Sequence, residues 1–435
     1  MNRTFSLSLG LGALISGVWV ATKGHAVAAP SVAVETASDL VQRDVQITVW
    51  KKALAADTTS AIALGQLAGL YMQRGRESGD ESNFLDAEAF ARKSVGSRTN
   101  RNGASFVTLA SSLLAQHRFI EADSVVTQLV ELEPDVPQYR SMLGEIKLEL
   151  GDYDAARALF GALVAYRTHL SIAPRLARWM EVTGDAPAAR RLLRDAVDEA
   201  SRRRDIPREQ LAWFYLRLGD LELRNGRMRG ATAAFRDGLA TQPNDYRLLA
   251  AMSRLEALRN RPRKAIEFGE RAMAIKLDPA TLGVIGDAYA AIGDSAQAED
   301  YSRTMELAVR SQPGAYHRAW SLFLLDRGDA RRTAQVLANA RAELETRRDV
   351  YGYDILAWAL HKSGRNAEAR QAMVGAMRMG TQDAMLFYHA GVIEYSLGDS
   401  LRSGQLLTKA LEINPRFHPT QAAAARNLLA RMRKR

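Results

Sequence analysis

The sequence has no cysteine among its 435 residues. A chain without cysteine forms no disulfide bond, no thiolate zinc site and no thiol nucleophile. This absence excludes the disulfide-rich secreted scaffolds and the cysteine-dependent enzymes, although it does not indicate a redox compartment. A chain of this length has enough residues to build an apolar core that needs no such cross-links.

Catalytic and nucleotide-binding motifs are also missing. The sequence contains no HExxH, and no GxGxxG, GxxxxGK[ST] or GxSxG in a strand-to-helix context. The pair His389 and Glu394 lacks the i, i+4 spacing that would place two metal ligands on one helical face. Many aspartates follow a glycine, as Asp152 and Asp185 do, where we expect them to cap the next helix. We therefore expect no enzymatic activity, no cofactor and no metal site.

Long apolar runs are absent after Ala29, so no later segment is expected to span a membrane. The N-terminus differs, because Arg3 precedes an apolar run over residues 5–21 and an A-x-A sequence at 26–28. This pattern predicts a secretory signal peptide at residues 1–28. Without a cysteine near the cleavage point no lipoprotein anchor forms. We expect a periplasmic or secreted protein, with membrane contact only if the leader is retained.

The charge balance is basic, with 59 Lys and Arg against 49 Asp and Glu, a net charge of +10. The basic clusters at residues 202–204, 259–264 and 431–435 fall in expected loops or at the terminus. A basic surface can attract nucleic acid, anionic lipid or an acidic polymer. We favour solvated helix faces for these clusters and expect no nucleic-acid partner.

Residues 210–244 show the pattern on which most of the chain is built. They predict two amphipathic helices, with Gly226 ending the first in the left-handed conformation. Gly219 and Ala231 are small where the two helices would cross, beside the aromatic Phe235. A large residue at either small position is expected to cost roughly 1–3 kcal/mol by overpacking.

Two positions of this pattern, the turn residue and the small residue of the second helix, recur along the chain at matching intervals. The turn position recurs at steps of 33 to 42 residues: Gly151, Gly184, Gly226, Asn260, Gly293, Gly328, Gly364 and Gly398, preceded by His117. The small residue of the second helix recurs at Ala87, Ala122, Ala156, Ala189, Ala231, Ala265, Ala298, Thr333, Ala369 and Ser403. Because both positions keep the same spacing over so many repeats, they indicate a repeat protein.

In these features the sequence resembles the tetratricopeptide repeat family, whose unit is about 34 residues of helix-turn-helix. The resemblance rests on leucine and small-residue pairs such as Leu218-Gly219, on the aromatics Phe160 and Phe235, and on closing prolines. Those prolines are Pro134, Pro243 and Pro415. Lys147 and Glu222 depart from the family pattern, since they stand where a tyrosine is usual. The resemblance implies an all-α, right-handed α-solenoid of about ten repeats with helical caps.

We divide the chain into a signal peptide (residues 1–28), an N-terminal capping helix region (29–60), the solenoid (61–417), and a C-terminal capping helix with a basic tail (418–435). Two insertions interrupt the repeats. Residues 76–84 are expected to lengthen a turn and residues 200–208 a link between repeats, both as surface loops. The second insertion has two interpretations: it is either a tolerated variation in length or a docking loop for an anionic partner.

Family geometry places the solvent face of the first helices on the concave surface, which is the candidate partner-binding groove. The aromatic residues of this surface would stack on a peptide side chain, a proline-rich segment or a sugar ring, with Arg318 and Asp354 fixing its orientation. These aromatic residues are Tyr351, Trp358, Tyr388 and Tyr395. Aromatics at helical spacing also fit a packed core, so both interpretations stay open. The candidate groove residues are Trp213, Arg247, Arg254, Arg318, Tyr351, Asp354, Trp358, His361, Tyr388 and Tyr395.

Two functions follow from this surface. The resemblance favours a non-enzymatic scaffold for protein–protein interaction in the bacterial periplasm or cell envelope, like other exported bacterial repeat proteins. The alternative is a glycan-handling factor in envelope or exopolysaccharide assembly or export, whose basic and aromatic groove residues bind an anionic polysaccharide. No repeat contains the Lys and Asn set with which some relatives clamp a terminal carboxylate. The sequence defines neither the protein partner nor an oligomeric state.

Overall fold

The computed structural model describes residues 32–310, 318–327 and 330–434, with side chains from residue 39 onward. Within these ranges the chain forms 22 α-helices, one short 3-10 helix and no β-strand. The predicted signal peptide lies outside the described residues. None of the described helices combines the length and apolar character needed to cross a membrane.

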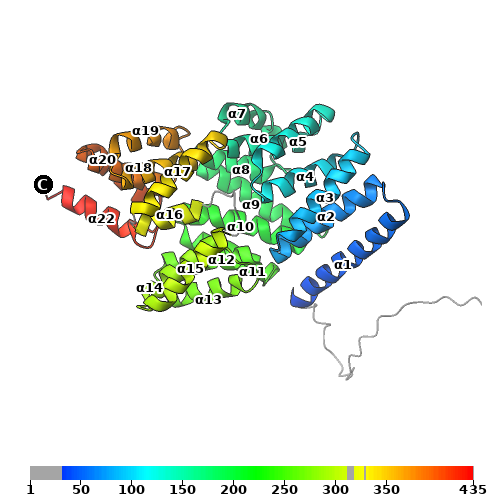
Figure 1. Ribbon diagram of the computed structural model, residues 1–435, viewed down its shortest axis with the longest axis horizontal. Helices are drawn as coiled ribbons and strands as arrows, with labels where there is room; N and C mark the ends of the chain where they lie inside the picture. The colour runs from blue at the N-terminus through cyan, green and yellow to red at the C-terminus, as the bar shows by residue number, and fades with distance from the viewer. Residues whose placement is uncertain (1–31, 311–317, 328–329, 435) are drawn as a thin grey trace, which may run out of the picture.

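Helices α2 to α21 form ten consecutive helix-turn-helix pairs in the described structure (Figure 1). The first helices are α2 (Ala61–Ser78), α4 (Gly103–Ala115), α6 (Pro137–Leu150), α8 (Ala173–Val182), α10 (Arg208–Arg224), α12 (Tyr246–Leu258), α14 (Pro279–Ala291), α16 (Arg318–Arg327), α18 (Val350–Lys362) and α20 (Ala384–Ser396). The second helices are α3 (Ser82–Ser97), α5 (Phe119–Leu132), α7 (Tyr153–Gly161), α9 (Ala186–Arg202), α11 (Met228–Thr241), α13 (Pro262–Met273), α15 (Ser295–Arg310), α17 (Ala330–Thr346), α19 (Asn366–Met377) and α21 (Ser400–Ile413). The predicted α-solenoid of about ten repeats is confirmed.

The turns inside the pairs use the predicted residues. Gly151 and Gly226 have φ of 80° and 69°, and Asn260 takes the same left-handed conformation where glycine is absent. Asp152 accepts a hydrogen bond from the backbone N–H of Ala155 and so caps α7. The predicted turn glycine Gly328 lies outside the described residues.

Small residues let the helices of a pair approach closely, as predicted. A Cβ atom on Gly219 would lie 2.3 Å from the ring of Phe235, which is fully buried. Gly144 has the same relation to Phe160, at 3.0 Å. These contacts confirm that the leucine-glycine pairs and the second-helix aromatics form the packing inside the repeats.

Single helices cover both ends of the solenoid. At the N-terminus α1 (Val32–Ala56) packs on α2 through buried Ile47, and at the C-terminus α22 (Gln421–Met432) packs on α21 through Ala422 and Ala425. The expectation for residues 76–84 needs correction, because α2 continues to Ser78 and leaves a short link at 79–81. Gly79 ends the helix there in the left-handed conformation. The second insertion is a link at residues 203–207, as expected.

The solenoid also folds back on itself, which the sequence did not predict. The C-terminal carbonyls of three first helices accept hydrogen bonds from loops five repeats further along the chain. The backbone N–H of Arg348 donates to Leu150 O (2.9 Å), Thr381 Oγ1 to Val182 O (2.6 Å) and Asn414 Nδ2 to Leu223 O (3.0 Å). The first two donors satisfy carbonyls that a helix end leaves unpaired, whereas Leu223 O also accepts from the backbone N–H of Gly226 at 3.1 Å.

We call this set of three loop-to-helix contacts the seam. It brings α17 and α18, yellow and orange in Figure 1, beside α6 and α8. Arg347 strengthens it, because its Nη2 lies 2.9 Å from Glu149 Oε2 at the end of α6. The seam therefore joins two successive turns of the superhelix.

Candidate functional site

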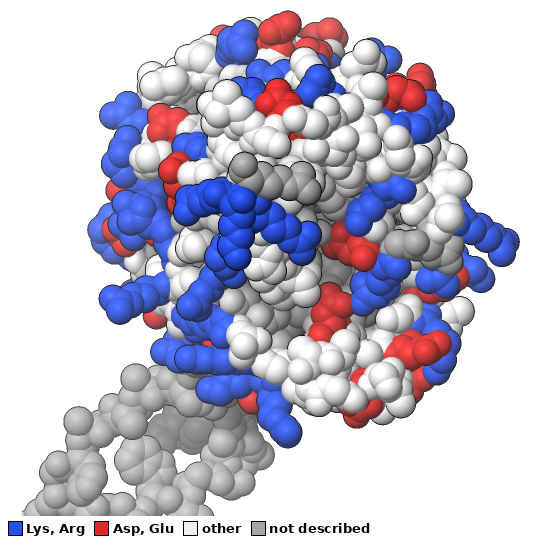
Figure 2. All heavy atoms as spheres, turned by 90° about the vertical axis from the view of Figure 1, so that its left-hand side faces the viewer, with Lys and Arg blue, Asp and Glu red and all other residues white. Residues whose placement is uncertain are grey.

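The first helices of the pairs form the inner layer of the solenoid. Successive first helices contact one another more closely than successive second helices do, so the layer they form is the concave one. The candidate groove residues lie on these first helices. The view from the end that carries α20 and α22 shows a hollow near its middle, with basic and acidic side chains on the rim (Figure 2).

Ion pairs link consecutive helices of the inner layer. In each pair a carboxylate on one first helix accepts from an arginine on the next. The pairs are Glu145 with Arg175 (2.7 Å), Glu181 with Arg224 (2.6 Å), Asp220 with Arg254 (2.8 Å) and Asp287 with Arg327 (2.6 Å). We call this set the inner ladder. One of its residues, Arg254, is a predicted groove residue.

Glu181 is the most strongly held carboxylate of the inner ladder. Its side chain is 9% exposed and also accepts from Arg178 Nη1 at 3.0 Å. Burial raises the pKa of Glu181, but Arg224, Arg178 and Arg217 outweigh it and bring the pKa to about 2. Glu181 is therefore ionised throughout the physiological range.

Three arginines, Arg178, Arg217 and Arg224, lie around Glu181. Arg217 makes no hydrogen bond or ion pair in the described structure, and burial together with the charges of Arg224 and Arg178 lowers its pKa. The Arg178 guanidinium also lies 5.5 Å from the centre of the Tyr351 ring. Burial raises the pKa of Tyr351. The predicted groove residue Tyr351 thus contacts this cationic region from across the seam.

Two predicted groove arginines are engaged in holding helix starts. Arg318 binds Asp349, which caps α18, at 3.0 Å and Glu343 at 2.7 Å. Arg247 binds the α12 cap Asp245 and lies 3.0 Å from Glu209. Burial lowers the pKa of both arginines, but the neighbouring carboxylates outweigh it and raise the pKa above the ordinary value. Their guanidinium groups are already paired, so the role in orienting a partner proposed for Arg318 has no support.

The predicted aromatic residues are brought together, but largely in the interior. Trp358 is 2% exposed and stacks between His389 at 4.1 Å and His361 at 4.9 Å. The Nδ1 atom of His389 lies 2.8 Å from Asp354 Oδ1. Tyr388, 7% exposed, tilts against Trp358 at 6.0 Å. Trp358 has no surface on which a partner segment can stack, so the packed-core interpretation describes it.

The remaining candidates lie apart from this stack. Trp213 is half-buried and packs edge to face on Phe214 at 5.3 Å. Tyr395 is half-buried further along α20. Arg254 is 45% exposed and belongs to the inner ladder. Of the predicted residues, Arg254 is thus the one that combines an inner position with an accessible charge.

A cavity of about 250 Å³ opens beside Arg254, where the seam meets the inner layer. Leu223, Leu258 and Val284 of α10, α12 and α14 form part of its wall. The segment after α21 supplies Phe417 and His418 from the other side. Sequence reasoning missed this site because Phe417 and His418 reach it only through the seam, and no local pattern marks that contact.

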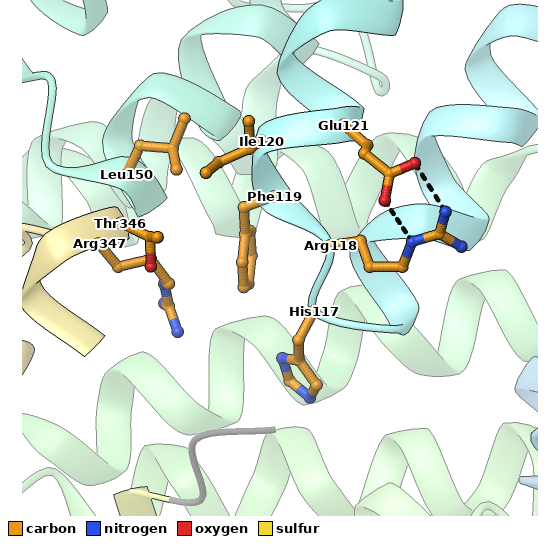
Figure 3. Close-up of a pocket in the computed structure, with 8 residues that line it drawn as sticks. All are labelled: His117, Arg118, Phe119, Ile120, Glu121, Leu150, Thr346 and Arg347. Atoms are coloured by element: carbon orange, nitrogen blue, oxygen red, sulfur yellow. Dashed lines mark hydrogen bonds and ion pairs between the residues drawn. The ribbon is translucent and has the colours of Figure 1, made fainter. Parts of the chain in front are cut away.

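A second cleft lies at the seam, between the α4–α5 turn and the end of α17 (Figure 3). The guanidinium of Arg347 lies 4.2 Å from the centre of the Phe119 ring. Arg118 and Glu121 form an ion pair at its edge, with a distance of 2.6 Å. These contacts explain the cleft as part of the packing between superhelical turns. In the described residues no group of three or more His, Asp or Glu has a metal-binding arrangement.

No family model and no curated protein matches the sequence. Solved structures similar to this chain include the APC/C hetero-tetramer Cut9–Hcn1, at 11% identity over 92% of this chain and 95% of that chain, with a TM-score of 0.35. A tetratricopeptide repeat protein from Parabacteroides merdae matches at 16% identity over 63% and 98%, with a TM-score of 0.36. PilF of Pseudomonas aeruginosa matches at 14% over 48% and 92%, with a TM-score of 0.38.

The class of the protein rests on its own geometry. Ten helix-turn-helix pairs, left-handed turn residues and small crossing residues define an α-solenoid of tetratricopeptide-like repeats. The resemblance stated from the sequence is thereby confirmed at the level of the fold.

Proposed function

We propose that the protein is a non-enzymatic scaffold that binds a segment of a protein partner along its inner layer. The observation that carries this proposal is the inner ladder, which presents both charge signs along consecutive first helices. Several of its members remain partly accessible, with Arg254 45% exposed and Arg327 39% exposed. Ion pairs of this exposure are weak, so a partner's charged groups can exchange with them at small cost.

The inner ladder favours a partner segment of mixed charge. Carboxylates of the partner would pair with Arg254 and Arg327, and its basic groups with Asp220 and Asp287. Charge pairing of this kind fixes the register of a bound segment more than it adds affinity. The binding is therefore expected to weaken as the salt concentration rises.

A photocrosslinking residue in place of Arg254 tests the proposal in intact cells. The matched control replaces Arg303, which is 62% exposed and pairs with acids of its own helix α15. We expect a discrete protein adduct from position 254 and none from position 303. Equal labelling at both positions, or none at either, would contradict binding along the inner layer.

We further propose that the protein works outside the cytoplasm, in the periplasm or beyond. The support is the apolar run at residues 5–21 followed by the A-x-A sequence at 26–28. Fractionation of cells and N-terminal sequencing of the mature protein test this point. A mature chain that starts at Ala29 in the periplasmic or secreted fraction is expected, whereas a cytoplasmic chain that starts at Met1 would refute it.

The alternative partner, an anionic polysaccharide, has weaker support. Such a polymer is attracted by a row of charges of one sign, whereas the inner ladder places a carboxylate beside each arginine, and these carboxylates repel an anionic polymer. Titration of the purified protein with an acidic polysaccharide distinguishes the two partners. Binding that weakens with salt, together with no protein adduct at position 254, would favour the polysaccharide.

A further inference from the structure

Helix α1, at the outer edge of the solenoid in Figure 1, has a row of exposed apolar side chains. Val41, Val45 and Val49 are 64%, 55% and 53% exposed. Residues four apart lie on the same side of a helix, so these three form one ridge, which we call the valine ridge. It points away from α2, because Ile47 on the opposite side of α1 is 5% exposed and packs on residues of α2.

The valine ridge differs from the other exposed apolar residues of the protein. Within the described ranges no other helix has more than two large apolar side chains that are exposed. Single exposed apolar residues are normal on a protein surface, whereas a contiguous row indicates an interaction surface. The valine ridge is therefore a candidate for contact with another helix.

The two borders of the valine ridge differ in charge. At 3.6 residues per turn, Asp44, Thr48 and Lys52 follow one border, while Gln42 and Gln46 follow the other. The side chains of all these residues are exposed. One border thus has an acid towards its N-terminal end and a base towards its C-terminal end, and the other border is uncharged.

This distribution of charge makes α1 complementary to a second copy of itself in antiparallel orientation. About a two-fold axis equal borders of the two helices face each other, so Asp44 of each copy lies beside Lys52 of the other. Asp44 accepts a hydrogen bond from Arg43 of its own chain at 2.8 Å, but its side chain is still 56% exposed and accessible. A parallel pair would place the charged border against the uncharged one and would separate Asp44 from Lys52.

We propose that the protein forms a homodimer through α1, in which two valine ridges pack in antiparallel orientation about a two-fold axis near Thr48. Rows of side chains spaced four residues apart interdigitate in the commonest class of helix packing. The interface is small compared with those of stable dimers, so the association is weak and depends on concentration.

The dimer has a consequence for binding that does not follow from the scaffold function alone. The valine ridge faces away from α2 and hence from the solenoid, so dimerisation leaves the inner layer of each copy open. Two inner layers in one particle bind a partner with two suitable segments more tightly than one inner layer does.

Sedimentation equilibrium of the purified protein tests the proposal. Between about 1 and about 100 μM we expect the mean mass to rise from that of one chain towards that of two. Val45→Lys places a charge in the valine ridge and should keep the protein monomeric over this range. Leu401→Lys is the matched control and should dimerise as the wild type does, since Leu401 of α21 is 77% exposed and lies outside the ridge. Circular dichroism checks that each variant is folded.

Exchange of charges tests the contact between Asp44 and Lys52. Asp44→Lys should weaken the dimer at least about tenfold, because it places a like charge beside Lys52 of the second copy. The double variant Asp44→Lys, Lys52→Asp restores opposite charges in both contacts and should recover the affinity of the wild type. A double variant no tighter than Asp44→Lys alone would contradict this contact.

The absence of cysteine allows the orientation to be measured with single introduced cysteines. Thr48→Cys lies near the two-fold axis, so a short bismaleimide should link two copies. In Val41→Cys the two cysteines of an antiparallel pair lie about 14 residues apart along the helices, or about 21 Å, and should not be linked. Equal linking of the two variants would show a parallel pair and would overturn the proposal.

A mass of one chain at every concentration, or a dimer that persists in folded Val45→Lys, would also overturn it. These outcomes are distinct from those that test the scaffold function. Sedimentation needs no protein partner, whereas the crosslink at position 254 can form on a monomer.

Discussion

Single residues set the spacing inside each repeat and the charge of the inner layer. Gly219 allows the ring of Phe235 to occupy the space that a larger residue would need. Glu181 holds two arginines of neighbouring first helices. Substitution of Gly219 is expected to change the free energy of unfolding, and substitution of Glu181 is expected to change how that free energy depends on pH.

Substitution of Gly219 by alanine should destabilise the protein by roughly 1–3 kcal/mol, because the added Cβ would lie 2.3 Å from a fully buried ring. Chemical denaturation measures the free energy of unfolding. Gly69→Ala is the matched control, since nothing lies within 4 Å of a Cβ on that glycine of α2. This control should stabilise by about 0.5–1 kcal/mol. Equal effects of the two substitutions would contradict the close packing.

The low pKa of Glu181 predicts a loss of stability in acid. Its folded-state pKa of about 2 lies below the ordinary value of 4.5. The stabilisation is therefore complete above about pH 4.5 and is lost as the pH falls towards 2, with a total of up to about 3 kcal/mol. Glu181→Gln should remove this part of the pH dependence.

Denaturation of Glu181→Gln and wild type between about pH 6 and 3 measures the difference. Glu299→Gln is the control, since Glu299 is 69% exposed and its ion pair with Arg303 contributes little. If the stability of Glu181→Gln falls with pH as steeply as that of the wild type, Glu181 does not have the low pKa.

At the scale of helices and loops, the sequence predicted the features that depend on nearby residues, namely the turns and the ends of the helices. The turn residues, the caps and the closing prolines Pro134, Pro243 and Pro415 agree with the ends of α5, α11 and α21. Each is determined by backbone conformation within a few residues. The helical extension of α2 to Ser78 was not predicted, because residues 76–78 have no strong helix signal and the stop at Gly79 decides the boundary.

The candidate groove was harder to predict for a physical reason. Helical spacing gives the direction of a side chain, but burial depends on what packs over it. Trp358 points from a first helix as expected and is covered by His389 of the next one. The cavity beside Arg224 depends on Phe417, which lies nearly two hundred residues away in sequence.

The loop donors of the seam can be tested one at a time. Asn414 is 2% exposed, and its Nδ2 donates to the carbonyls of Leu223 and Arg224 at the end of α10. Asn414→Ala leaves these carbonyls without that donor and should cost about 1–3 kcal/mol. Ser396→Ala removes an exposed hydroxyl bond within α20 and should change the stability little. A neutral result for Asn414→Ala would show that this contact of the seam contributes nothing to stability.

At the scale of the whole molecule, the seam adds contacts between distant repeats to those between neighbouring repeats. An open repeat array has contacts between neighbouring repeats only and behaves as a one-dimensional chain. Here loops at Arg348, Thr381 and Asn414 contact helices five repeats earlier. The superhelix is therefore held at a fixed pitch.

Opening of the seam should lengthen the molecule without melting its helices. In the double variant Thr381→Val, Asn414→Ala, we expect a larger radius of gyration by small-angle X-ray scattering. The far-ultraviolet circular dichroism should stay unchanged, because each helix pair keeps its neighbours. A radius of gyration equal to that of the wild type would show that other contacts set the pitch.

The seam also has a consequence for the order in which the chain folds. Its hydrogen bonds join residues separated by up to 199 positions, so α6, α8 and α10 are synthesised long before their carbonyls find these donors. Until then the nascent solenoid consists of local contacts, which form fast, while the long-range closure comes last. Completion of the fold therefore waits for the C-terminal third of the chain.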